Sequence, residues 1–139
     1  MIFPIPVTAN YFEEVYVLKG QYKMKSVYDF YQSADTNSLD FFYELSESYA
    51  EEEYSILVNQ DGIKITYAKE VGRFRALTSV YQLIENGVAG CCEIHDLPQF
   101  PHRGYMLDIS RGKIPTRETI FRYVDILCGL KYNEFQLYI

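Results

Sequence analysis

The sequence has no tryptophan, only three cysteines and only two histidines. The cysteines, Cys91, Cys92 and Cys128, are too few and too unevenly spaced for a disulfide framework or a zinc site. We therefore expect them to be reduced and buried, which favours the cytoplasm over secretion. The histidines, His95 and His102, lie near Asp96 but match no standard metal-binding spacing. We expect no metal and no other cofactor.

Positive charge is also scarce. The net charge is −6, and the densest charge cluster, residues 51–53, is acidic. Phosphate binding requires clustered lysine and arginine, so we expect no nucleic-acid partner. No apolar run reaches the roughly 18 residues of a membrane span, so we expect no membrane partner. The first residues contain two prolines and no basic region, which argues against a signal peptide. Cytoplasmic and secreted locations both stay open, with the cytoplasm favoured.

Aromatic residues are abundant. The chain has 139 residues, of which 14 are tyrosine and 9 are phenylalanine. This length fits one domain with room for a modest second piece. Tyrosine combines apolar area with a hydroxyl that needs a partner, so we expect tyrosines at a partly hydrated edge of the core. We assign the aromatic clusters at 28–31 and 40–45 to core packing rather than to sugar stacking.

The first hundred residues predict a small antiparallel sheet with two helices on one face. Alternating polarity around Lys19-Gly20 predicts a hairpin of residues 14–18 and 21–27. Residues 36–38 can cap a helix over 39–49. The clearest hairpin joins residues 54–58 to 63–67 through Asp61-Gly62. Helical spacing predicts a helix over 71–85, ended by Asn86-Gly87, before a short strand at 91–94.

The pattern changes after Pro101. A strand at 104–109 is followed by a helix that Thr116 can cap, running to about residue 130, and by a strand at 135–139. This order predicts a βαβ unit with two parallel strands. A parallel sheet needs both faces covered, and one helix cannot cover both. We therefore expect an α+β fold in which residues 1–98 form an accessory domain. Residues 99–139 would begin a larger barrel that is cut off here.

Residues 98–139 resemble the opening of the catalytic (βα)8 barrel of family-20 glycoside hydrolases, the β-N-acetylhexosaminidases. The matching residues are Phe100, Arg103-Gly104, residues 105–107, Asp108-Ile109-Ser110-Arg111 and Lys131-Tyr132-Asn133. Residues 54–84 are similar to the small α+β domain of the same family, with Gly72, Phe74, Gln82 and Leu83 in its pattern. The resemblance covers residues 54–139 well and residues 1–53 only loosely.

The resemblance implies a retaining glycosidase that removes terminal β-linked N-acetylhexosamine from glycans by a substrate-assisted mechanism. In that mechanism the acetamido oxygen of the sugar is the nucleophile, and an adjacent Asp-Glu pair orients it and supplies the acid. No Asp-Glu pair occurs after residue 100. We therefore expect no catalytic residue in this chain and no activity from the fragment alone, although its full-length parent would be an enzyme.

The resemblance also implies a substrate-binding role for Arg103, because the family arginine of the Arg-Gly pair bonds hydroxyls of the terminal sugar. Position along the strand favours Arg111 instead, because the active-site residues of such barrels lie at the carboxyl ends of the strands. Arg111 can equally form an ion pair with Asp108. We therefore assign Asp108 and Arg111 to structure or to the pocket rim.

Two further expectations remain. The chain could instead be a non-catalytic α+β module that binds a protein or a carbohydrate. An open strand edge and apolar side chains in residues 102–139 also predict a homo-oligomer formed through that segment.

Overall fold

The structure, a computed structural model, describes residues 2–36 and 39–139. The chain forms two compact units, Met1–Pro98 and Gln99–Ile139. The first unit contains β1 (Thr8–Val17), α1 (Val27–Thr36), β2 (Phe41–Leu45), β3 (Tyr54–Asn59), β4 (Gly62–Tyr67), α2 (Glu70–Leu83), β5 (Ile84–Glu85) and β6 (Val88–Asp96). Among the described residues, no helix is long and apolar enough to cross a membrane.

The strands of the first unit form one sheet in the order β1-β6-β3-β4-β2, with β5 paired to β6. Every pair is antiparallel except β2 with β4, which is parallel. The α+β class is confirmed, while the sheet is mixed rather than purely antiparallel.

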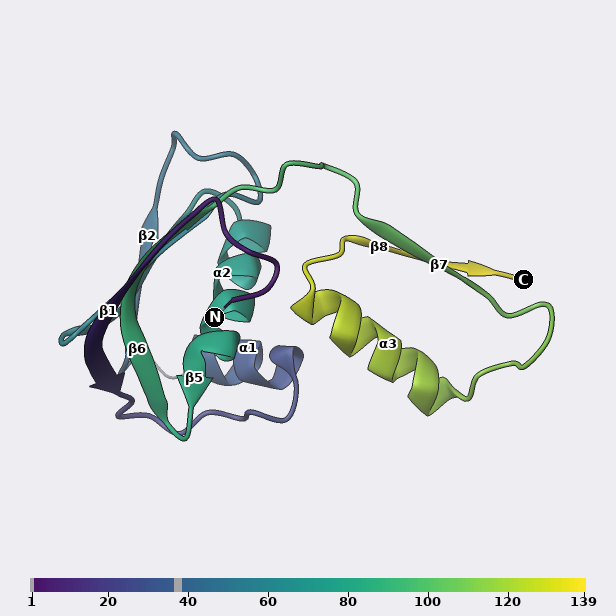
Figure 1. Cartoon of the computed structure of the whole chain (residues 1–139), viewed down its shortest axis with the longest axis horizontal. Helices are drawn as coiled ribbons and strands as arrows, with labels where there is room; N and C mark the ends of the chain where they lie inside the picture. Colours follow the sequence, from purple (N-terminus) through teal and green to yellow (C-terminus); the bar gives the residue numbers. More distant parts are fainter. Residues whose placement is uncertain (1, 37–38) are drawn as a thin grey trace. The chain divides into compact units, whose positions relative to one another are not determined.

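The helices α1 and α2 lie on one face of this sheet (Figure 1). The alternation along β3 explains why, because Tyr54, Ile56 and Val58 are buried and the residues between them are not. Phe30 of α1 and Leu77 of α2 join them in the core. Ser55 and Leu57 therefore point to the opposite, outward face of the sheet.

The hairpin predicted at 54–58 and 63–67 is confirmed, as is the helix predicted over 71–85. The helix predicted over 39–49 is wrong, because Phe41–Leu45 is the strand β2. Phe41 and Tyr43 lie opposite Ile63 and Ile65 of β4, so the segment buries alternate residues. Its predicted N-cap residues Asn37 and Ser38 lie outside the described residues.

The hairpin predicted between residues 14–18 and 21–27 is also wrong. β1 pairs with β6, from Thr8 opposite His95 to Val17 opposite Val88. The second helix on the covered face is α1, which follows Ser26. The Ser26 hydroxyl caps it by accepting a hydrogen bond of 3.1 Å from the backbone N–H of Asp29.

The predicted role of Asn86-Gly87 needs correction too. The helix α2 ends at Leu83, and Ile84–Glu85 is already a strand. Asn86 and Gly87 form the turn between β5 and β6, with φ of 52° and 77°. The positive-φ residues expected at a helix end are therefore used for a tight hairpin.

Asp40 links the end of β1 and the segment after it to the start of β2. Its side chain is fully buried. It accepts hydrogen bonds from the hydroxyls of Tyr16 and Tyr22, both at 2.6 Å, and from the backbone N–H groups of Lys19 and Gly20. Four donors satisfy the carboxylate and hold the segment after β1 against the start of β2.

The second unit is the predicted strand, helix and strand: β7 (Gly104–Asp108), α3 (Arg117–Gly129) and β8 (Glu134–Tyr138). The two strands are parallel, from Gly104 opposite Glu134 to Asp108 opposite Tyr138. Thr116 caps α3 as predicted, because its hydroxyl accepts from the backbone N–H of Thr119 at 3.3 Å.

Candidate functional site

The carboxyl ends of β7 and β8 lie next to each other, and charged side chains gather at the end of β7. Asp108 is the last residue of that strand. One of its oxygens accepts from the backbone N–H and the hydroxyl of Ser110, at 2.9 and 2.7 Å. The other accepts from Nε and Nη2 of Arg111, at 3.1 and 2.9 Å. We call Asp108, Ser110 and Arg111 the carboxyl-end cluster.

The carboxyl-end cluster presents a positioned cation to solvent. The hydrogen bonds from Ser110 and then from Arg111 lower the pKa of Asp108 below its usual value, so it carries charge at neutral pH. The Arg111 side chain is 82% exposed. Its Nη1 has no hydrogen-bond partner within residues 2–36 and 39–139. Asp108 therefore fixes one edge of the guanidinium and leaves donors for a ligand.

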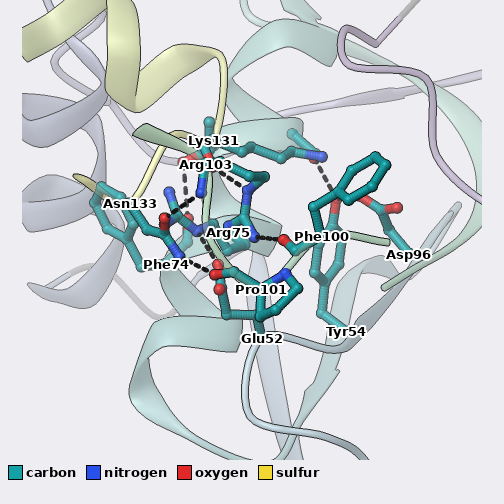
Figure 2. Close-up of polar contacts among 12 residues, drawn as sticks. Glu52, Tyr54, Phe74, Arg75, Asp96, Phe100, Pro101, Arg103, Lys131 and Asn133 are labelled. Atoms are coloured by element: carbon teal, nitrogen blue, oxygen red, sulfur yellow. Dashed lines mark hydrogen bonds and ion pairs between the residues drawn. The ribbon is translucent and has the colours of Figure 1, made fainter. Parts of the chain in front are cut away.

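Arg103 lies at the other end of β7, before its first residue. Its Nε donates to the carbonyl of Lys131 at 2.9 Å, and its Nη1 donates to the carbonyl of Phe100 at 2.6 Å. Figure 2 shows Arg103 close to Lys131, in the turn between α3 and β8, and to Phe100, in the segment before β7. We call Arg103 and its partners here, together with Asn133, the amino-end cluster.

Asn133 completes the amino-end cluster (Figure 2). Its amide oxygen accepts from the backbone N–H of Arg103 at 2.9 Å, and its amide nitrogen donates to the carbonyl of Pro101 at 2.7 Å. Its own backbone N–H donates to the carbonyl of Arg103 at 3.0 Å. The two sequence signals at Arg103-Gly104 and at Lys131-Tyr132-Asn133 are thus parts of one hydrogen-bonded connection. Asn133 is part of the family resemblance, but its role follows only from these contacts.

The remaining candidates are held by partners of their own. His95 bonds Ser55, Asp96 accepts from Tyr54, and His102 bonds Glu134. Within the described part of the chain, no three histidine, cysteine or acidic side chains converge as metal ligands. Cys91 and Cys92 are buried. Burial raises the pKa of the Cys92 thiol to about 11, so it is protonated at neutral pH.

Comparison with known proteins finds similarity to glycosyl hydrolases. Residues 100–139 match the profile of glycosyl hydrolase family 20, catalytic domain. Beta-hexosaminidase subunit beta of Rattus norvegicus is 35% identical over 96 residues, which are 65% of this chain and 18% of that protein. The N,N'-diacetylchitobiase of Vibrio harveyi is 30% identical over 103 residues, which are 72% of this chain and 11% of that protein.

Solved structures show the same fold. The β-N-acetylhexosaminidase of Bacteroides fragilis superimposes with a TM-score of 0.82 and 25% identity over 99% of this chain and 32% of that one. The exo-β-N-acetylglucosaminidase of Vibrio harveyi gives a TM-score of 0.80 at 22% identity, over 96% of this chain and 24% of that one. The chain therefore spans less than a third of the length of these relatives.

Proposed function

We propose that this chain, which is similar to family-20 glycosyl hydrolases, is part of an enzyme that removes terminal β-linked N-acetylhexosamine from glycans. In this proposal Met1–Pro98 is the accessory α+β domain and Gln99–Ile139 is the start of the catalytic barrel. The reaction would retain the anomeric configuration, with the acetamido oxygen of the substrate as nucleophile. The Asp-Glu pair that this mechanism requires is not among residues 100–139.

One observation carries the proposal: an exposed, fixed arginine stands at the carboxyl end of a parallel strand, within the residues that match the catalytic-domain profile. Active sites of (βα)8 barrels are built at that end. A guanidinium held by Asp108 can donate to two adjacent sugar hydroxyls without first losing much conformational freedom. The role of Arg111 would be to bind and orient the terminal sugar.

Arg103 remains the residue that the family resemblance assigns to the sugar. Its geometry supports a different role, because its guanidinium donates to backbone carbonyls at the amino end of β7. A charged donor bonded to these two carbonyls joins the turn between α3 and β8 to the segment before β7. We propose that Arg103 holds the strand in register and that Arg111 contacts the sugar.

A chimera tests the proposal. Residues 99–139 of this chain would replace the matching segment of the Bacteroides fragilis enzyme, and hydrolysis of 4-nitrophenyl N-acetyl-β-glucosaminide would be measured. We expect an active chimera, while the 139-residue chain alone is inactive. Arg111→Lys should lower kcat/KM by about 100-fold, because lysine cannot donate as a planar fork.

The matched variant is Arg103→Lys in the same chimera. We expect it to lower the Tm and to leave kcat/KM of the folded protein within about threefold. The reverse pattern would assign the sugar to Arg103. A chimera that folds but hydrolyses nothing would contradict the proposed function.

We also propose that the 139-residue chain associates with a second copy of itself through residues 102–139. Met106 is 60% exposed, Phe121 61% and Ile139 89%. Apolar side chains in such numbers on one small unit favour association. Light scattering should give a dimer or larger species at tens of micromolar, and Met106→Lys should shift it toward the monomer. A monomeric wild-type chain would contradict this.

A further inference from the structure

A second group of polar side chains converges on the outward face of the sheet in the first unit, on the side opposite α1 and α2. Alternation along β3, β4 and β6 points Ser55, Lys64, Thr66, Glu93 and His95 away from the core. These residues and Asn10 of β1 line one pocket. We propose that this pocket binds a neutral saccharide unit. The inference does not rest on the proposed function, because no residue of the carboxyl-end cluster takes part.

One wall of the pocket is a chain of hydrogen bonds. His95 Nε2 lies 3.3 Å from a Glu53 carboxylate oxygen, which can only accept, so Nε2 carries a hydrogen. His95 Nδ1 and the Ser55 hydroxyl form a hydrogen bond of 3.0 Å. The hydroxyls of Ser55 and Tyr49 form a second one, of 2.7 Å. Each partner fixes the next, so the orientation of the imidazole and of Ser55 is set before any ligand arrives.

The other wall is fixed by an ion pair. Lys64 Nζ lies 2.9 Å from a Glu44 oxygen, and the Thr66 hydroxyl donates to the same oxygen at 3.1 Å. The charge of Lys64 is therefore already balanced. Glu44 comes from β2, and Lys64 and Thr66 come from β4, so the parallel pairing of these strands sets the spacing of the three side chains.

The balance of charge selects the ligand class. A phosphate or carboxylate would need an unpaired cation, and Lys64 is paired while Glu93 adds negative charge to the lining. The remaining lining groups are hydroxyl, amide and imidazole, which together donate and accept. Sugar hydroxyls also donate and accept, and Leu57 offers apolar surface for the C–H face of a ring. Prepositioned groups lower the entropic cost of binding such a ligand.

Titration of the ¹⁵N-labelled 139-residue chain tests the inference, with N,N′-diacetylchitobiose and maltose as neutral probes and glucose 6-phosphate as the anionic one. We expect saturable shifts of the amides of Ser55, Thr66 and His95 with a neutral probe, in the millimolar range typical of weak sugar sites. Asn10→Ala, which removes an exposed side chain of the lining, should weaken binding by at least about fivefold. Ser48→Ala, exposed and away from the lining, is the matched control and should change nothing.

Several results would overturn the inference. One is no saturable shift with either neutral probe up to about 50 mM. Another is binding that Asn10→Ala and the pocket-filling Asn10→Trp both leave unchanged. A stronger response to glucose 6-phosphate would show an anion site instead. The same spectra separate the two proposals: shifts confined to residues 108–111 would support the proposed function alone, and shifts confined to the sheet face would support this inference alone.

Discussion

At the scale of single residues, Asp40 is the side chain on which the first unit depends most. It is fully buried, and both carboxylate oxygens accept two hydrogen bonds each. Asp40→Asn would place an amide N–H group against these donors. We expect it to lower the free energy of unfolding by about 2–4 kcal/mol, measured by urea denaturation.

Tyr22→Phe serves as the comparison for that variant. It removes one hydroxyl donor and leaves the carboxylate with three, so it should cost only about 1 kcal/mol. If both variants lower the free energy of unfolding equally, the charge of the carboxylate makes no contribution beyond its hydrogen bonds.

The same carboxylate predicts how stability depends on pH. Burial by itself would raise the pKa of Asp40, but the bonds from Tyr16, Tyr22 and two backbone N–H groups outweigh it and lower the pKa below 3.8. Its stabilising contribution is therefore present above about pH 4 and is lost as the pH falls through the folded-state pKa. The difference in Tm between wild type and Asp40→Asn should shrink below pH 4. A constant difference would refute this assignment.

The residues of the candidate site were only partly predictable. Asp108 and Arg111 stand out in the sequence because charges bracket an apolar strand. Asn133 does not stand out, because its partners are backbone groups of residues 101 and 103, which only the fold brings to it. The outward pocket is less visible still, since its lining comes from four strands spread over residues 8–95.

At the scale of elements, the β3–β4 turn depends on a glycine. Gly62 has φ of 148°, and a Cβ there would lie 2.7 Å from the Phe42 ring and 2.9 Å from the Asp40 carbonyl oxygen. That carbonyl accepts from the backbone N–H of Ile63 at 2.8 Å, so it cannot move freely. We expect Gly62→Ala to cost about 2–3 kcal/mol.

Gly90 provides the matched control for Gly62, because a Cβ at this position in β6 meets nothing within 4 Å. Gly90→Ala should stay within about 0.5 kcal/mol of wild type in the same urea titration. A cost for Gly62→Ala no larger than that of Gly90→Ala would contradict the steric argument.

The start of α3 offers a second test at this scale. The Thr116 hydroxyl accepts from the backbone N–H of Thr119, which otherwise lacks a helical partner. Thr116→Ala should destabilise the second unit by about 1 kcal/mol and speed hydrogen exchange at the first amides of α3. Thr116→Ser retains the hydroxyl oxygen and should behave as wild type. If Thr116→Ser also speeds exchange at these amides, loss of the N-cap hydrogen bond does not explain the effect of Thr116→Ala.

The elements that the sequence predicted correctly are those whose pattern is local. The β3–β4 hairpin has its own turn, α2 has sustained helical spacing, and the βαβ order of the second unit follows from short connections. The prediction for residues 39–49 failed because the aromatic run Phe41-Phe42-Tyr43 fits a helical and an alternating pattern equally, and pairing with β4 decides between them. Residues 14–27 failed because the partner of β1 lies far along the chain, in β6.

At the scale of the whole molecule, the two units differ in how much core each contains. The buried core cluster lies within the first unit, whereas Leu127 is the buried apolar side chain of the second, at 9% exposure. The free energy needed to unfold part of a protein rises with the apolar surface that this unfolding exposes. Hydrogen exchange should therefore be slowest in β3, β4 and β6, and faster throughout β7, α3 and β8. Uniform protection of both units would contradict this ranking.

The pairing of β1 with β6 carries a consequence for synthesis of the protein. A ribosome releases β1 first, yet its partner residues, Val88 to His95, emerge only when the first unit is nearly finished. Until then β1 has no strand beside it, and Tyr16, which is buried in the finished unit, stays open to solvent. Nascent chains arrested before β6 should thus be substrates for chaperones and proteases. The first unit should become resistant to proteolysis abruptly once β6 has left the exit tunnel of the ribosome.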